Sequence, residues 1–177
     1  AREATLERVG PEVPEDLAER AMVIGMAALK FMLLRVNPKT TIMFDPNAAI
    51  KFEGDTGPYV LYAYARISSM LRKAGDDTLT GAVDWSVLGA EEEKELALRC
   101  SQYGQATRKA AGDLDTSALA GYLLDLAKAF SRFYRACPVL AAPSDAERRA
   151  RLELSGRVRT ILRDGLSTLT IGTLESM

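Results

Sequence analysis

The chain of 177 residues contains no histidine, and this absence removes a large part of enzyme chemistry. Nucleophilic triads built on His, His general bases and His-ligated metal sites are all excluded. Cysteine is scarce too: only Cys100 and Cys137 occur, far apart and without a Cys-x-x-Cys spacing. We therefore expect two reduced, partly buried thiols rather than metal ligands or a redox pair.

Long apolar runs and an excess of positive charge are also missing. No stretch reaches the length of a membrane span, and the N-terminus has no signal-peptide layout. The sequence therefore predicts a cytoplasmic protein without a membrane partner. Its net charge of −1 argues against binding of nucleic acid through overall charge, so DNA is not expected and RNA would need a local patch.

What the chain does contain is typical of a folded helical domain, with 47% apolar and 27% charged residues. Apolar periodicity, caps and breakers predict helices over residues 15–36, 46–52, 56–75, 90–111, 116–136 and 144–164. A β-prone segment at 40–44 predicts a minor short strand. The expected fold is an all-α helical bundle.

No catalytic or metal-binding motif stands out. There is no P-loop and no dinucleotide fingerprint, and the GDTG at 54–57 is best explained as a capped turn because no Lys-Ser/Thr follows it. Carboxylate pairs occur only in predicted loops and first turns, where nothing would raise a carboxyl pKa for acid–base work. We assign no residue to catalysis and none to a metal.

One predicted helix face has a distinctive chemistry. Between residues 56 and 75 there is no carboxylate, and helical spacing places Tyr62, Arg66, Ser69 and Lys73 in one row. Val60, Tyr64, Ile67 and Leu71 form the opposing apolar stripe. Flat rings and a guanidinium beside an ammonium suit base stacking and phosphate binding. From periodicity alone, half-buried core tyrosines are the commoner outcome.

Three stretches of the chain match signatures of a known family. Residues 52–75 read FEGDTGPYVLYAYARISSMLRKAG, and this string resembles FEG-[ND]-TGPY-x-x-YA-x-AR, the start of the anticodon-binding helical domain of arginyl-tRNA synthetases. The helix at 118–140 resembles a second signature, which ends in Phe-Tyr before Cys-Pro-Val. Residues 151–177 resemble the family's basic last helix and its terminus, which commonly reads Glu-Arg-Met where this chain has Leu-Glu-Ser-Met.

The resemblance implies that residues 1–55 form the tail of a catalytic core and residues 56–177 the anticodon-binding (DALR-type) helical domain. The parent protein would be an arginine–tRNA ligase that uses ATP and Mg. Its catalytic motifs do not occur in this chain, which begins at Ala1 and is expected to be an excised piece, inactive alone and without a cofactor. The implied partners are the anticodon loop of an arginine-specific tRNA and the upstream catalytic core.

Four residues match family positions near the anticodon loop. Tyr62 and Arg66 match the tyrosine and arginine of the YA-x-AR element, Tyr134 the second aromatic of the Phe-Tyr pair, and Met177 the terminal methionine. Unstacked bases favour such aromatic, guanidinium and thioether surfaces. The chain departs from the family at Leu61 and Tyr64, where Gln and His are frequent.

Two other interpretations stay open at this point. One is a stand-alone paralogue that uses the same helical domain for protein–protein interaction. The other is a structural bundle without a ligand. The combination of Tyr62, Arg66, Tyr134 and Met177 favours RNA, because an adaptor has no reason to retain all four.

Overall fold

A computed structural model describes residues 16–75 and 82–177, and within them it is helical with no strand. The helices are α2 (Leu17–Leu34), α3 (Pro46–Ala49), α4 (Gly57–Ala74), the 3-10 turn η2 (Trp85–Val87), α5 (Glu91–Ser101), α6 (Tyr103–Asp113), α7 (Ser117–Ala136) and α8 (Asp145–Thr168). The predicted all-α fold is confirmed. None of these helices has the length and apolar character needed to cross a membrane.

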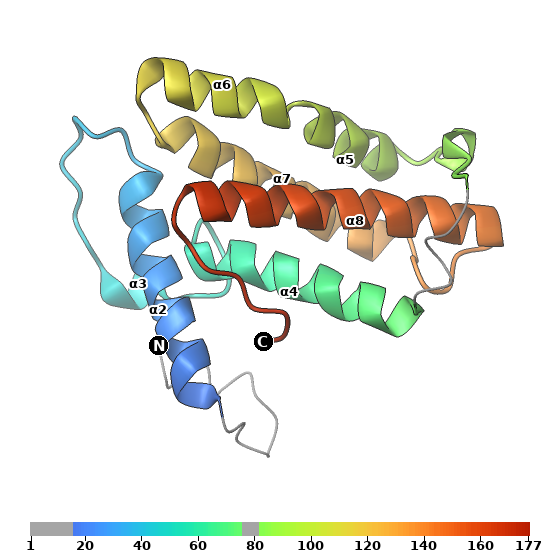
Figure 1. The fold of residues 1–177 in the computed structure, drawn as a ribbon, viewed down its shortest axis with the longest axis horizontal. Coiled ribbons are helices and arrows are strands. Elements are labelled where there is room, and N and C mark those ends of the chain that lie inside the picture. Colours follow the sequence, from blue (N-terminus) through green and yellow to red (C-terminus); the bar gives the residue numbers. More distant parts are fainter. Residues whose placement is uncertain (1–15, 76–81) are drawn as a thin grey trace.

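Helix α7 lies at the centre of the bundle. It packs against α4, α5, α6 and α8, which run roughly alongside it, and α2 crosses one end of this group (Figure 1). Its apolar side chains recur at helical spacing, and Leu123, Leu126, Phe130 and Phe133 have no exposed surface. The core therefore forms around the helix for which the sequence shows the most regular apolar pattern.

Three expectations about element bounds were wrong. The predicted helix at 90–111 is two helices that meet at Gln102, where the Arg99 carbonyl accepts hydrogen bonds from the Gln102 N–H and the Tyr122 hydroxyl. Residues 40–44 form no strand, because none of the described segments pairs with their backbone. Gly165 does not end α8 but lies inside it, where a Cβ would come within 2.5 Å of Leu123 Cδ2.

Helix α2 is only half covered by the rest of the domain. Ile24, Ala27 and Phe31 are buried against the bundle, whereas Met22, Met26, Leu29 and Leu33 are exposed. These four follow helical spacing and form one apolar stripe on the uncovered side. The structure thus agrees with the expectation that this helix carries more apolar surface than the rest of the bundle covers, as far as residues 16–75 and 82–177 show. Glu15, at its predicted start, lies outside the described residues.

Candidate nucleic-acid interface

The predicted row of side chains lies on α4, and local sequence explains why this helix starts where it does. The Thr56 hydroxyl caps the helix by accepting a hydrogen bond from the Tyr59 N–H at 3.2 Å, and Pro58 occupies the first turn. Gly57 lets the helix approach α2 closely, because a Cβ there would lie 2.3 Å from the Ala27 carbonyl oxygen. Val60, Tyr64 and Ile67 are buried as predicted, which turns Tyr62 and Arg66 outward.

Arg66 lies between two tyrosine rings. Its Nη2 donates a hydrogen bond of 2.6 Å to the Tyr62 hydroxyl one turn earlier. Its Cζ lies 4.5 Å from the centroid of the Tyr62 ring and 5.1 Å from that of the Tyr134 ring. Cation–π contacts at these distances hold the planar guanidinium between the end of α7 and the face of α4.

Tyr134 comes from the last turn of α7, where the two aromatics of the Phe-Tyr pair separate. Phe133 is fully buried, whereas Tyr134 is 40% exposed and packs at 5.9 Å, centroid to centroid, on the ring of Phe130. The Tyr134 ring is therefore held in place by its contact with Phe130, and part of it stays accessible to solvent.

Met177 reaches the same place from the other end of the chain. The segment after α8 turns back past α2 and ends beside α4 (Figure 1). There a pocket of about 270 Å³ opens to solvent. It is lined by Tyr62, Ala65, Arg66, Ser69, Met70, Lys73, Tyr134, Leu140, Ser176 and Met177. The structure thus brings all four candidate residues together around one open pocket; that they bind RNA stays a prediction.

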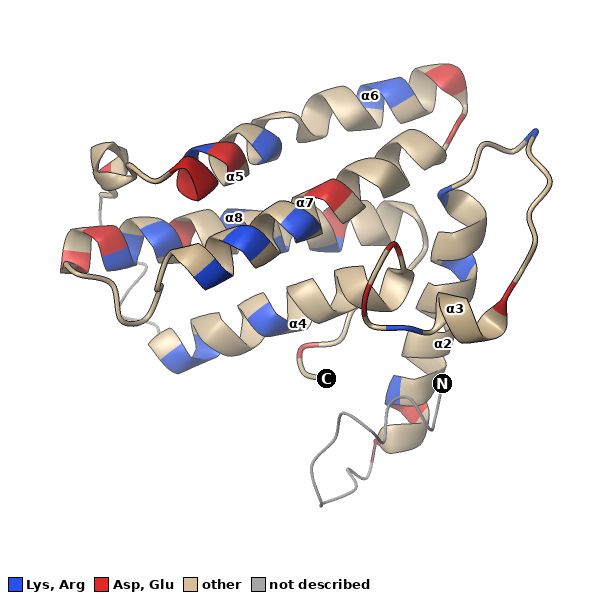
Figure 2. Ribbon diagram, turned by 180° about the vertical axis from the view of Figure 1, so that it is seen from behind, with Lys and Arg blue, Asp and Glu red and all other residues tan. Residues whose placement is uncertain are grey.

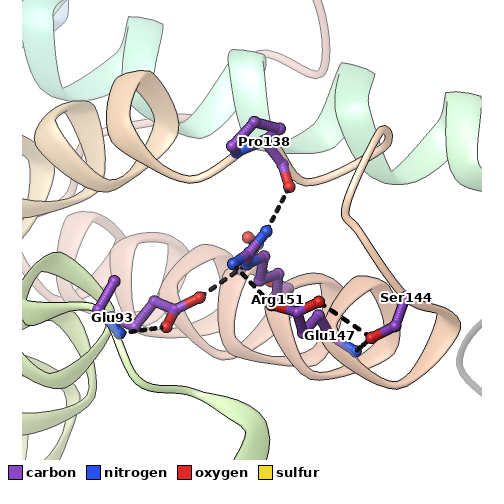
Figure 3. A network of polar contacts seen from close by, with 7 residues as sticks. Glu93, Pro138, Ser144, Glu147 and Arg151 are labelled. Atoms are coloured by element: carbon purple, nitrogen blue, oxygen red, sulfur yellow. Dashed lines mark hydrogen bonds and ion pairs between the residues drawn. The ribbon is translucent and has the colours of Figure 1, made fainter.

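The wall that carries Tyr134 and Leu140 is braced by a buried ion pair. Arg151 of α8 donates from Nε to Glu93 Oε1 at 2.7 Å and from Nη1 to the Pro138 carbonyl at 2.9 Å (Figure 3). Glu93 also accepts a hydrogen bond from the Ala90 N–H, at 2.8 Å. One guanidinium therefore joins the start of α5, the connector after α7 and the first turns of α8.

The C-terminal segment is fixed by contacts that sequence reasoning missed. Glu175 accepts hydrogen bonds from the Tyr64 hydroxyl and from Arg159, and its backbone carbonyl accepts one from Arg72. Burial alone would raise the pKa of Glu175, but hydrogen bonds from Tyr64, Ser68 and Arg159 and the charge of Arg159 bring this pKa below its usual value. The only sequence signal for Glu175 was its match to the Glu of the Glu-Arg-Met terminus that is common in the family.

Two cationic side chains, Arg66 and Lys73, line the pocket, although the net charge of the chain is −1. Helix α4 carries Arg66, Arg72 and Lys73 and no acid, whereas the acidic start of α5 lies elsewhere on the molecule (Figure 2). The local patch that RNA binding would need is therefore present.

The remaining polar features point to no second chemistry. Cys100 is partly buried and Cys137 is buried, and both are free thiols. Burial raises the pKa of Cys100 to about 11, so the thiol stays protonated at neutral pH. No cluster of acids and cysteines able to hold a metal occurs within residues 16–75 and 82–177. Trp85 lies under the guanidinium of Arg157, 4.9 Å away, at the edge of a separate groove between α5 and α8.

Comparison with known proteins shows the family of the chain. The profile of the DALR anticodon binding domain matches residues 60–177. The chain belongs to this family. It is 40% identical over 168 residues to an arginine–tRNA ligase of Shewanella halifaxensis, an alignment that covers 94% of this chain and 29% of the relative. It is 41% identical over 164 residues to the enzyme of Shewanella loihica, covering 92% of this chain and 28% of that protein.

A solved structure extends the likeness to the fold. The chain superposes on Thermus thermophilus arginyl-tRNA synthetase with a TM-score of 0.89 and 38% identity, over 99% of this chain and 30% of that one. The resemblance to arginyl-tRNA synthetases is thereby confirmed, and the interpretation as a protein-interaction paralogue is not favoured. This DALR-family chain spans less than a third of the length of these relatives. The boundary expected between residues 55 and 56 stays a prediction, and residues 1–15 of the first part lie outside the described residues.

Proposed function

We propose that the pocket beside α4 binds unpaired bases of the anticodon loop of an arginine-specific tRNA. The observation that carries this proposal is the convergence of Tyr62, Arg66, Tyr134 and Met177 on one open pocket. An unpaired base stacks on aromatic, guanidinium and thioether surfaces, with a contribution of about 1–3 kcal/mol per base for aromatic stacking. The hydroxyl of Ser69 and the ammonium of Lys73 line the same pocket and supply hydrogen bonds to base edges and phosphates.

We propose further that this chain serves as the anticodon-recognition part of a cytoplasmic arginine–tRNA ligase. None of its residues is assigned to catalysis, and the joining of arginine to tRNA, with ATP and Mg, would belong to a catalytic core. The exposed stripe of Met22, Met26, Leu29 and Leu33 on α2 is the surface we assign to contact with that core. Alone, the chain should then self-associate or bind a hydrophobic dye. The double variant Met26→Gln, Leu29→Gln should reduce both self-association and dye binding. A wild-type chain that is monomeric and binds no dye would contradict the assignment.

Arg66→Ala tests the RNA site directly. We expect it to weaken binding of a hairpin carrying the anticodon stem and loop of an arginine tRNA by about 1–3 kcal/mol in a fluorescence titration. Arg157→Ala is the matched control, since Arg157 also lies over an aromatic ring but does not line the pocket. Unchanged affinity in Arg66→Ala, or equal affinity for a hairpin with an altered anticodon, would refute the proposal.

A further inference from the structure

The segment that follows α8 is held along its length although it forms no helix. Leu169 and Ile171 are buried, and the Ile171 N–H donates to the Leu166 carbonyl at 2.8 Å. Lys30 of α2 reaches the Thr170 carbonyl at 2.5 Å. The segment therefore stays in the core as far as Ile171, and the residues after it run along the surface to the pocket.

Glu175 is bound directly before Ser176 and Met177, the two residues of this segment that line the pocket. Its Oε1 accepts a hydrogen bond of 2.6 Å from the Tyr64 hydroxyl, and both carboxylate oxygens lie 2.9 Å from Arg159 Nη2. Arg72 Nη2 donates to the Glu175 carbonyl at 3.0 Å. Glu175 is thus bound through its carboxylate by Tyr64 of α4 and Arg159 of α8, and through its backbone carbonyl by Arg72 of α4.

The groups that hold Glu175 are themselves fixed. Arg159 Nε donates to Ser68 Oγ at 2.8 Å, and the Arg159 guanidinium lies 5.3 Å from the centroid of the buried Tyr64 ring. Tyr64 is 1% exposed, so its hydroxyl has a defined position at the surface of α4. Such preorganised donors can place a peptide segment accurately because they lose little freedom when it docks.

We infer that Glu175 is a positioning residue that sets Met177 in the RNA pocket, an inference that rests on the proposed function. One residue, Ser176, separates the anchor from the terminal methionine, and its carbonyl accepts a hydrogen bond from Arg20 at 3.3 Å. Without the carboxylate anchor, the last residues would become ordered only when RNA binds. The loss of conformational entropy would then weaken the binding of RNA. Glu175 itself does not line the pocket, so it acts through Met177.

A double-mutant cycle on the 177-residue chain tests this coupling. We expect Glu175→Ala and Met177→Ala each to weaken binding of the arginine anticodon hairpin about tenfold, and the double variant to be about as weak as either single one. Glu175→Gln keeps an acceptor for Tyr64 and should fall between wild type and Glu175→Ala. Glu153→Gln is the matched control, because Glu153 pairs with Arg157 on α8 and does not line the pocket.

The outcomes separate the inference from the proposed function. If Arg66→Ala weakens binding but Glu175→Ala does not, or if the losses in Glu175→Ala and Met177→Ala simply add, the positioning role is wrong and RNA binding stands. If Arg66→Ala leaves binding unchanged, the proposed function fails and the positioning role fails with it. The melting temperature of each variant shows whether the fold is retained. If the variants that bind more weakly are also unfolded, the loss of affinity has another cause and the positioning role is wrong.

Discussion

The hydroxyl of Tyr64 donates a hydrogen bond of 2.6 Å to the carboxylate of Glu175, which lies 111 positions later in the sequence. Tyr64 is buried in α4, and Glu175 lies on the segment that ends in the pocket. The pair therefore ties the first helix of the interface to the last residues of the chain. It also gives a physical role to a position where arginyl-tRNA synthetases often have His.

Removal of this hydroxyl should lower stability without changing the core. In Tyr64→Phe the ring stays in place, but Glu175 loses a donor, and we expect the free energy of unfolding to fall by about 1.5–3 kcal/mol, as for hydrogen bonds to charged groups. Tyr59→Phe on the same helix is the control, since its hydroxyl bonds the neutral Ser131 at 3.0 Å and should matter less. Urea unfolding measures both, and equal losses in the two variants would contradict a special role for the Glu175 contact.

The docked segment should be released in acid. The folded-state pKa of Glu175 is below its ordinary 4.5, because the hydrogen bonds from Tyr64, Ser68 and Arg159 outweigh the effect of burial, which acts in the opposite direction. A carboxyl whose pKa is lowered by folding contributes stability that is fully present above the ordinary pKa and is lost as the pH falls through the folded one. The charged side chains that contact Glu175 are Arg72 of α4, which binds its backbone carbonyl, and Arg159 of α8, which binds its carboxylate.

The methyl NMR signal of Met177 reports this release. We expect it to move toward its unfolded position with a midpoint below pH 4.5, while signals of core methyl groups such as those of Leu123 stay unchanged. In Tyr64→Phe the midpoint should shift upward, because one of the bonds that lowers the pKa is gone. A midpoint at or above pH 4.5 in the wild-type chain would show that Glu175 is not held as a carboxylate.

Local signals in the sequence were sufficient for most of the fold. Caps and breakers predicted helix starts at residues 56 and 144, and the hydroxyls of Thr56 and Ser144 do cap α4 and α8 by accepting hydrogen bonds from the helix backbone. The break at Gln102 was missed because it contains neither Gly nor Pro; the Tyr122 hydroxyl, a tertiary contact, occupies the Arg99 carbonyl there. The predicted end of the last helix at residue 164 was wrong for a similar reason, since Gly165 continues the helix where it packs on Leu123 of α7.

The candidate site likewise contains residues that local sequence predicts and residues that only tertiary contacts bring together. Tyr62 and Arg66 could be placed on one face because they are four residues apart on one helix. Tyr134 and Met177 came from the family resemblance alone, since no local pattern shows that the ends of α7 and of the chain meet at α4. The contacts that bring them there, through Arg151 and Glu175, join residues 58 and 111 positions apart and leave no periodic trace in the sequence.

The close contact between α2 and α4 should tolerate no side chain at Gly57. A Cβ there would lie 2.3 Å from the Ala27 carbonyl oxygen and 2.8 Å from Phe31 Cβ, and backbone cannot move aside as a flexible side chain can. We expect Gly57→Ala to reduce the free energy of unfolding by about 1–3 kcal/mol through overpacking. Gly121→Ala in α7, where no atom lies within 4 Å of the new Cβ, should instead stabilise the chain by about 0.5–1 kcal/mol. The same sign of change for both substitutions in urea unfolding would disprove the close packing.

The ion pair between Arg151 and Glu93 should be the most sensitive polar contact in the bundle. The side chains are 9% and 1% exposed, so Arg151→Ala leaves a carboxylate out of water without its cation, and we expect a loss of about 3–5 kcal/mol in urea unfolding. Lys109→Ala removes an ion pair with Asp113 that is exposed on both sides, and it should barely change the midpoint of urea unfolding.

A second variant separates the buried charge from the buried volume. Arg151→Met combined with Glu93→Gln removes both charges, keeps apolar bulk in place of the arginine stem and leaves an acceptor for the Ala90 N–H. We expect it to be more stable than Arg151→Ala, because no unpaired ion remains. The Pro138 carbonyl still lacks its donor, so the connector beside Tyr134 should loosen and the anticodon hairpin should bind more weakly than to the wild-type chain. A double variant that binds the hairpin as tightly as wild type would show that Arg151 supports the fold but not the pocket wall.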